Sequence, residues 1–163
     1  MITEKIGDLL EDFENGKVNV IAHQCNCMHT MGAGIARIIA DKFPEAEDAD
    51  KATPYGSESK LGTFSVASLP DGRKIVNLYG QFTTSRSERA TSYDAIFNAL
   101  FELELVINNS KQRDQYTIGI PYGMSSDLAG ASWTVIRAML ERIFGKSPVK
   151  LVIVRLPSMR ELA

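Results

Sequence analysis

The chain has 163 residues, 44% of them apolar and 23% charged, a balance typical of globular proteins rather than disordered or fibrous ones. The formal net charge of −2 provides no basic field, which argues against general nucleic-acid binding. No apolar run approaches the ~20 residues of a membrane span, and residues 1–5 lack the charged-then-apolar order of a signal peptide. We therefore expect a cytoplasmic protein that makes no membrane contact and folds as a single domain over residues 1–163.

Strands and helices are predicted to alternate in the first half of the chain. Residues 18–22 form a nearly continuous apolar, β-branched run, as in a strand that is covered on both faces. Apolar residues then recur at helical spacing over 35–43, and Pro44 closes this segment. Residues 64–69 and 74–79 flank a Pro-Asp-Gly turn, so we expect them to pair as antiparallel strands.

The second half continues the alternation. The clearest helical stripe of apolar residues covers 93–107. Residues 116–120 form the next predicted strand, and after a Gly/Ser loop the apolar residues of 135–144 repeat at three and four until Gly145. A last buried strand is expected at 151–154. This order predicts an α/β fold with three layers, in which a central mixed β-sheet lies between helices.

The two cysteines of the chain, Cys25 and Cys27, are separated by one residue, and His23 and His29 lie nearby. Structural zinc sites usually draw two pairs of ligands from separate segments, and no second cysteine pair follows. We therefore expect two buried thiols in a reducing compartment and no metal ion.

Two glycine-containing loops each follow a predicted strand and precede a predicted helix. They cover residues 23–34 and 121–130. In open α/β sheets, ligands bind beyond the carboxyl ends of the strands, where helix N-termini present unpaired N–H groups. Glycine lets the backbone approach a phosphate closely, although a tight turn alone can also require it. Neither loop is a Walker loop or a dinucleotide fingerprint, and we expect the two loops to hold one diphosphate.

Short motifs in order along nearly the whole chain carry a family resemblance. They are I-G-D-L-L at 6–10, H-Q-C-N-C at 23–27, M-G-A-G-I-A at 31–36, N-L-Y-G-Q at 77–81, T-S-Y-D at 91–94 and L-A-G-A-S-W at 128–133. Together they resemble the macro domain family, closest to its branch of ADP-ribose 1″-phosphate phosphatases and ADP-ribosyl-glutamate hydrolases. The resemblance implies that Asp8 accepts a hydrogen bond from the adenine amino group and that Asn26 contacts the distal ribose of ADP-ribose.

The loops and the resemblance together predict the site residues. The expected ligand-binding residues are Asp8, Leu9, Asn26, Met31, Gly32, Ala33, Gly34, Ile35, Tyr122, Gly123, Met124, Ser125, Ser126 and Leu128. The candidates for catalysis are His23, as nucleophile or base on a terminal phosphate, and Asp127, which could orient a water or a histidine. The alternatives are that His23 is a strand-end residue satisfied by the backbone and that Asp127 caps a helix.

The chain also departs from the branch. Ser125, Ser126 and Asp127 stand where many relatives have G-C-G, so the second loop keeps its N–H donors but loses the freedom of glycine. Ser132 replaces an Asp that often precedes the Trp, and residues 83–86 contain no match for the lysine nucleophile of the glutamate-linked hydrolases.

Three functions follow for comparison. The first is a hydrolase that needs no cofactor and acts on ADP-ribose 1″-phosphate or on an ADP-ribosyl linkage. This hydrolase is the function that we expect. The alternative is a binder without turnover, whose partners are ADP-ribose, ADP-ribosylated macromolecules or a related nucleotide signal, and the altered second loop argues for it. The third, a scaffold that binds no nucleotide, would leave the glycine loops and Asp8 without a shared purpose.

Overall fold

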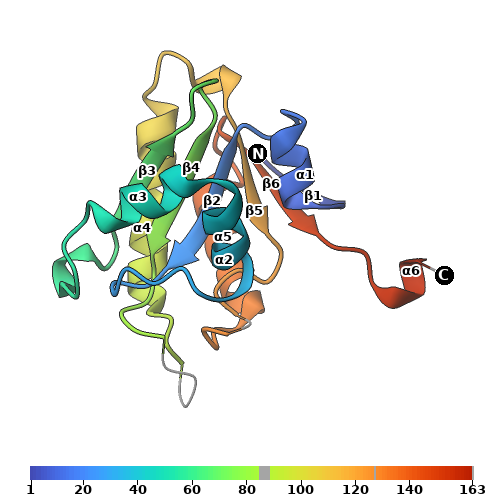
Figure 1. The fold of residues 1–163 in the computed structure, drawn as a ribbon. Coiled ribbons are helices and arrows are strands. Elements are labelled where there is room, and N and C mark those ends of the chain that lie inside the picture. Colours follow the sequence, from blue (N-terminus) through green and yellow to red (C-terminus); the bar gives the residue numbers. More distant parts are fainter. Residues whose placement is uncertain (85–88, 127, 163) are drawn as a thin grey trace.

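The computed structural model describes residues 1–84, 89–126 and 128–162. These residues form a six-stranded sheet in the order β1-β6-β5-β2-β4-β3 (Figure 1). The strands are β1 (Ile2–Ile6), β2 (Val20–Cys25), β3 (Phe64–Ser68), β4 (Lys74–Tyr79), β5 (Thr117–Pro121) and β6 (Lys150–Arg155). Neighbouring strands pair in parallel, apart from the antiparallel pair of β3 and β4. The predicted mixed sheet and its antiparallel pair are confirmed.

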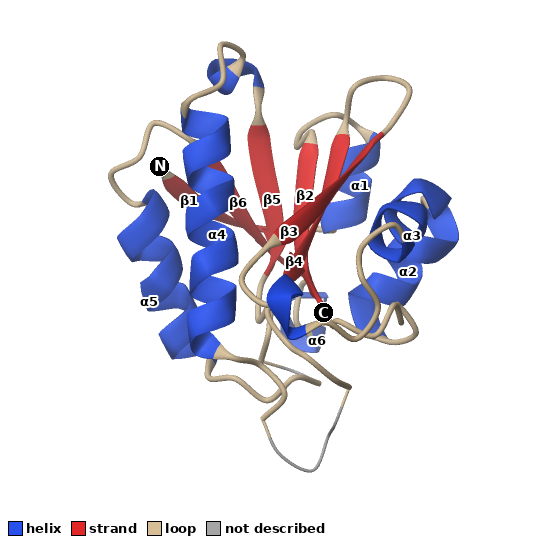
Figure 2. Cartoon of the chain, turned by 90° about the vertical axis from the view of Figure 1, so that its left-hand side faces the viewer, coloured by secondary structure: helices blue, strands red, loops and turns tan. Residues whose placement is uncertain are grey.

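Helices cover both faces of this sheet (Figure 2). The helices that cover it are α1 (Leu9–Glu14), α2 (Gly34–Lys42), α3 (Pro44–Lys51), α4 (Tyr93–Asn108) and α5 (Trp133–Phe144). A short helix α6 (Met159–Leu162) projects away from the sheet (Figure 1), and 3₁₀ turns lie at Glu58–Lys60 and Arg113–Gln115. One face packs against α4 and α5 and the other against α1, α2 and α3. The three-layer α/β prediction is therefore confirmed. Among the described helices, none is long and apolar enough to cross a membrane.

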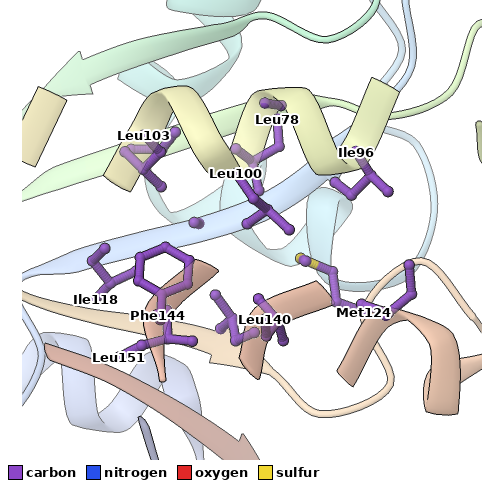
Figure 3. Packing of buried hydrophobic residues seen from close by; sticks show 14 of the residues in the cluster. Leu78, Ile96, Leu100, Leu103, Ile118, Met124, Leu140, Phe144 and Leu151 are labelled. Atoms are coloured by element: carbon purple, nitrogen blue, oxygen red, sulfur yellow. The ribbon is translucent and has the colours of Figure 1, made fainter. Parts of the chain in front are cut away.

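The apolar stripes predicted from the sequence form the core. On the α4 and α5 side, Ile96, Leu100, Leu140 and Phe144 are fully buried against the sheet (Figure 3). Burial of one such side chain contributes roughly 1.5–3 kcal/mol. The opposite face has its own apolar cluster, in which Phe13 of α1 is fully buried. Both faces of the sheet are thus dry, and the residues of its central strands must be small, apolar or fully hydrogen-bonded.

The alternation of side chains along β2 decides which residues meet which layer. Val20 and Ala22 belong to the core under α4 and α5, whereas Ile21 belongs to the core under α1, α2 and α3. Successive side chains of a strand point to opposite faces. His23 therefore shares the face of Ile21, and Gln24 shares the face of Ala22.

Candidate functional site

An open cleft of about 490 Å³ lies at the carboxyl ends of β2, β4 and β5. This volume is within the usual range for small-molecule sites. The loop after β2, the loop after β4 and the loop after β5 supply its lining. The predicted binding residues that the structure brings together on this lining are Asn26, Gly32, Ala33, Gly34, Ile35, Tyr122, Gly123, Met124, Ser125 and Leu128. The two glycine-containing loops thus face one space.

Other predicted residues lie off the described lining. Leu9 and Met31 are buried in the apolar cluster under α1, α2 and α3. Asp8 caps α1, where its Oδ1 accepts hydrogen bonds from the backbone N–H groups of residues 10 and 11 at 2.9 and 3.2 Å. The hydroxyl of Ser126 donates to the carbonyl of Gly123. Asp127, the second catalytic candidate, lies outside the described residues.

The loop after β2 is organised by Asn26 and ends at an open helix terminus. The Asn26 amide accepts from the N–H of Met28 at 2.8 Å and donates to the carbonyl and the hydroxyl of Thr30 at 2.8 and 2.9 Å. Gly34 begins α2 with φ +58°, and no described side chain caps that N-terminus. Because the first N–H groups of a helix have no intrahelical acceptor, this terminus is suited to an anion.

The loop after β5 contains a strained residue. Ser125 has φ +70°, in the left-handed region that residues other than glycine rarely adopt. Its carbonyl accepts from the Thr91 hydroxyl and from the Ala131 N–H, both at 3.0 Å. The sequence predicted that this loop loses the conformational freedom of glycine. In the structure, a serine adopts the backbone conformation that glycine would otherwise supply.

Sequence reasoning missed part of the lining. The lining residues without a predicted role are Gln24, Cys25, Thr30, Ala36, Gln81, Thr84, Pro121 and Ala129. A signal for two of them was present. Gln24 lies beside His23 at the end of the same strand, and Gln81 ends the N-L-Y-G-Q motif. Gln24 is the centre of a polar cluster, because its Nε2 donates to Gln81 Oε1 at 2.7 Å and to Thr91 Oγ1 at 2.9 Å.

The described lining of the cleft contains no charged side chain. Its polar groups are amides, hydroxyls and backbone, and its remaining surface is apolar. An anionic ligand would therefore be held by backbone N–H groups and by the dipole of α2.

His23 lies on the other face of the sheet from the Gln24 cluster, and it is fully buried. Its Nε2 lies 2.8 Å from Oδ1 of Asn77, its neighbour across β2 and β4. Burial lowers the pKa of His23 from 6.5 to about 4, although the bond to Asn77 opposes this shift. The imidazole is thus neutral at pH 7. Among the described residues, the cleft lining does not include it, and its partner is a side chain instead of the expected backbone.

Both thiols are buried and free. Burial raises the pKa of Cys25 well above its ordinary value, so this thiol is protonated near neutral pH and is a poor nucleophile. Within the described part of the chain, no group of three or more His, Cys, Asp or Glu side chains is placed to hold a metal ion.

No protein-family model matches the sequence. The chain is 32% identical over 150 residues to an uncharacterized 17.5 kDa protein from the tk-vs intergenic region of enterobacteria phage T4, covering 90% of this chain and 92% of the phage protein. Among solved structures, a Bacteroides thetaiotaomicron protein of unknown function superposes with a TM-score of 0.78 at 21% identity, over 96% of this chain and 98% of its own.

Two further solved structures are similar. The macrodomain of Thermus aquaticus DarG has a TM-score of 0.72 at 19% identity, over 96% of this chain and 99% of its own. Thermosipho africanus DarTG, solved in complex with ADP-ribose, has a TM-score of 0.69 at 15% identity, over 94% of this chain and 41% of its own. Identities at this level show a shared fold.

Proposed function

Because the chain belongs to the family of the phage T4 17.5 kDa protein and has the macro domain fold, we propose that its cleft binds ADP-ribose or a close derivative. The observation that carries this proposal is the uncapped N-terminus of α2, which begins at Gly34 and opens between the two glycine-containing loops. The similar Thermosipho africanus protein was solved with ADP-ribose, which supports the same ligand.

In this proposal the diphosphate lies at the N-terminus of α2, opposite the loop that contains Ser125. The distal ribose lies toward Asn26, as the resemblance implies. Asp8 uses Oδ1 to cap α1, which leaves Oδ2 to accept the adenine amino proton. Backbone N–H groups, which are fixed in direction, suit a diphosphate at a site whose described lining carries no cation.

Binding is the function that the described geometry supports, and for His23 that geometry gives no support to hydrolysis. A general base must come within hydrogen-bond reach of the reacting proton. His23 is fully buried and away from the cleft, and Asp127 lies outside the described residues. Hydrolysis of ADP-ribose 1″-phosphate or of an ADP-ribosylated macromolecule, and membership of the phosphatase and glutamate-hydrolase branch, stay predictions. Released phosphate or released ADP-ribose from those substrates is the measurement that decides on turnover.

Titration calorimetry with ADP-ribose tests the binding proposal. Replacing Gly34 by Val adds a branched side chain at φ +58°, where the backbone is expected to meet phosphate, so affinity should fall by about tenfold or more. Gly72→Val is the matched control. Gly72 lies in the turn between β3 and β4 at φ +92°, and no described atom would lie within 4 Å of its new Cβ.

Both variants place a β-branched residue at a positive φ, but at different places in the fold. Gly72→Val should lose stability, measured as a lower melting temperature, and should keep its affinity for ADP-ribose. Absence of ADP-ribose binding by the unmodified chain would refute the proposal, and equal affinity of Gly34→Val and the unmodified chain would refute the placement of the diphosphate.

A further inference from the structure

One side chain joins the three loops of the cleft. Gln24, at the end of β2, donates from Nε2 to Gln81 Oε1 at 2.7 Å and to Thr91 Oγ1 at 2.9 Å, both in the loop after β4. Its Oε1 accepts from the hydroxyl of Ser125, in the loop after β5, at 2.6 Å. Both hydrogens of the amide nitrogen are therefore used within the protein.

The fold leaves space for this amide. Gly80 lies beside it, and a Cβ on Gly80 would lie 2.3 Å from Gln24 Oε1 and 3.0 Å from Cβ of Ile96. Glycine at position 80 is thus required for the amide to occupy its place between β4 and α4. The position of the Gln24 amide is therefore fixed by its hydrogen bonds and by Gly80, and a fixed amide can fix the positions of its hydrogen-bond partners.

The partner that needs holding is Ser125. At φ +70° its backbone is in a conformation that costs a residue with a side chain about 1–2 kcal/mol. Its hydroxyl is fixed by Gln24 and its carbonyl by Thr91, and the Thr91 hydroxyl is also bound to Gln24. The same amide therefore fixes Ser125 directly and through Thr91.

We propose that Gln24 is a positioning residue for the ligand site, which keeps Ser125 in the left-handed conformation and so sets the backbone of the loop after β5 against the ligand. The inference rests on the proposed function. Gln24 acts through Ser125, because both of its amide hydrogens are already donated to Gln81 and Thr91 and neither can be donated to a ligand.

A double-mutant cycle tests this proposal. Gln24→Leu removes the three hydrogen bonds at similar side-chain volume, and we expect the affinity for ADP-ribose to fall by about tenfold, because the binding-competent loop becomes a minor conformation. Ser125→Gly places a residue that adopts φ +70° without strain, so Gln24→Leu should cost less affinity in a chain with Gly at position 125 than in the chain with Ser. Gln24→Leu/Ser125→Gly should recover most of the affinity that Gln24→Leu loses. A side chain that only stabilised the fold would show no such recovery.

A second pair of variants leaves Gln24 in place. It tests whether Gln24 positions Ser125 even if Gln24→Leu fails to fold. Ser125→Ala keeps the backbone strain and removes the hydroxyl that Gln24 holds, so it should lose affinity by several-fold, on the order of one hydrogen bond. Ser125→Gly, which relieves the strain, should bind ADP-ribose more tightly than Ser125→Ala. Equal affinities of the Ala and Gly variants would overturn the proposal, as would a Gln24→Leu/Ser125→Gly chain that binds as weakly as Gln24→Leu.

Failure of the proposed function gives a different result. If the unmodified chain binds no ADP-ribose, urea unfolding of the same four chains still measures the coupling between Gln24 and Ser125. Gln24→Leu should then destabilise the chain with Ser125 more than the chain with Gly at that position. Equal destabilisation in the two backgrounds would overturn the positioning role of Gln24.

Discussion

His23 and Gln24 are neighbours on β2, yet they belong to two different polar clusters on opposite faces of the sheet. His23 faces α3 and is completely removed from solvent, whereas Gln24 faces the other layer and lines the cleft. Strand alternation alone separates them. A histidine attracts attention as a candidate for catalysis, but the described lining of the cleft includes the glutamine beside it.

The His23 cluster is a chain of hydrogen bonds between secondary-structure elements. Asn77 of β4 accepts a hydrogen bond from His23 through its Oδ1. Its Nδ2 donates to the carbonyl of Ala46 in α3 at 3.0 Å and to the hydroxyl of Ser65 in β3 at 3.1 Å. The hydroxyls of Ser65 and Tyr79 lie 2.8 Å apart, and Tyr79 donates to Asp50 of α3 at 2.8 Å. These bonds fasten α3 to the sheet, so the cluster should govern stability. The Gln24 cluster should govern affinity.

The largest expected effect of this contrast is on stability. Asn77→Leu removes two buried hydrogen bonds, one to His23 and one to the Ala46 carbonyl, whereas Ser65 keeps the Tyr79 hydroxyl as a partner. Each unsatisfied buried group costs about 1–3 kcal/mol, so the free energy of unfolding should fall by about 2 kcal/mol or more. Urea unfolding measures this loss, and calorimetry at a temperature where the variant is folded should find ADP-ribose affinity unchanged. A loss of affinity as large as that of Gln24→Leu would show that the two clusters are not separate.

The pH dependence of stability tests the burial of His23 directly. Its pKa is about 4 in the folded chain and 6.5 ordinarily, so the unfolded chain binds more protons between these values. Stability should therefore be complete above pH 6.5 and should fall as the pH is lowered, by about 1.4 kcal/mol per pH unit until pH 4 is approached. Urea unfolding between pH 5 and pH 7 measures the slope. His23→Gln, which cannot titrate, should have a smaller slope, and equal slopes would contradict a neutral, buried imidazole.

Much of the fold was predictable because it depends on hydrophobic periodicity. The residues of α4 and α5 repeat at helical spacing, and β2, β5 and β6 are apolar runs buried on both faces. Four elements, β1, α1, α3 and α6, were missed for physical reasons. Helices α1 and α6 have six and four residues, too few for a helical stripe to be recognised. β1 is an edge strand with polar, exposed residues, and Pro44, taken as the end of a helix, is the first residue of α3.

The candidate site was only partly predictable. Glycine between a strand and a helix identified both loops, since that signal is local. The role of Gln24 depends on partners far along the chain, Thr91 and Ser125, which meet only when β2, β4 and β5 lie side by side. The face of His23 follows from its alternation with Ile21, but only once the limits of β2 are known.

The smallest expected effect is that of Asp8 variants on the affinity for ADP-ribose. These variants test whether the ligand extends beyond the described cleft lining toward α1. Asp8→Ala removes both the helix cap, worth about 1 kcal/mol of stability, and the proposed acceptor for adenine, worth about 1–3 kcal/mol of affinity. Asp8→Asn keeps the cap through its Oδ1 but turns an N–H₂ group toward the adenine amino group. It should therefore lose affinity for ADP-ribose and keep its melting temperature. An analogue with hypoxanthine in place of adenine has a carbonyl oxygen where adenine has its amino group, so Asp8→Asn, which can donate to that oxygen, should bind the analogue more tightly than the unmodified chain does. If Asp8→Asn binds ADP-ribose as tightly as the unmodified chain, Asp8 is a helix cap alone, and adenine is bound elsewhere.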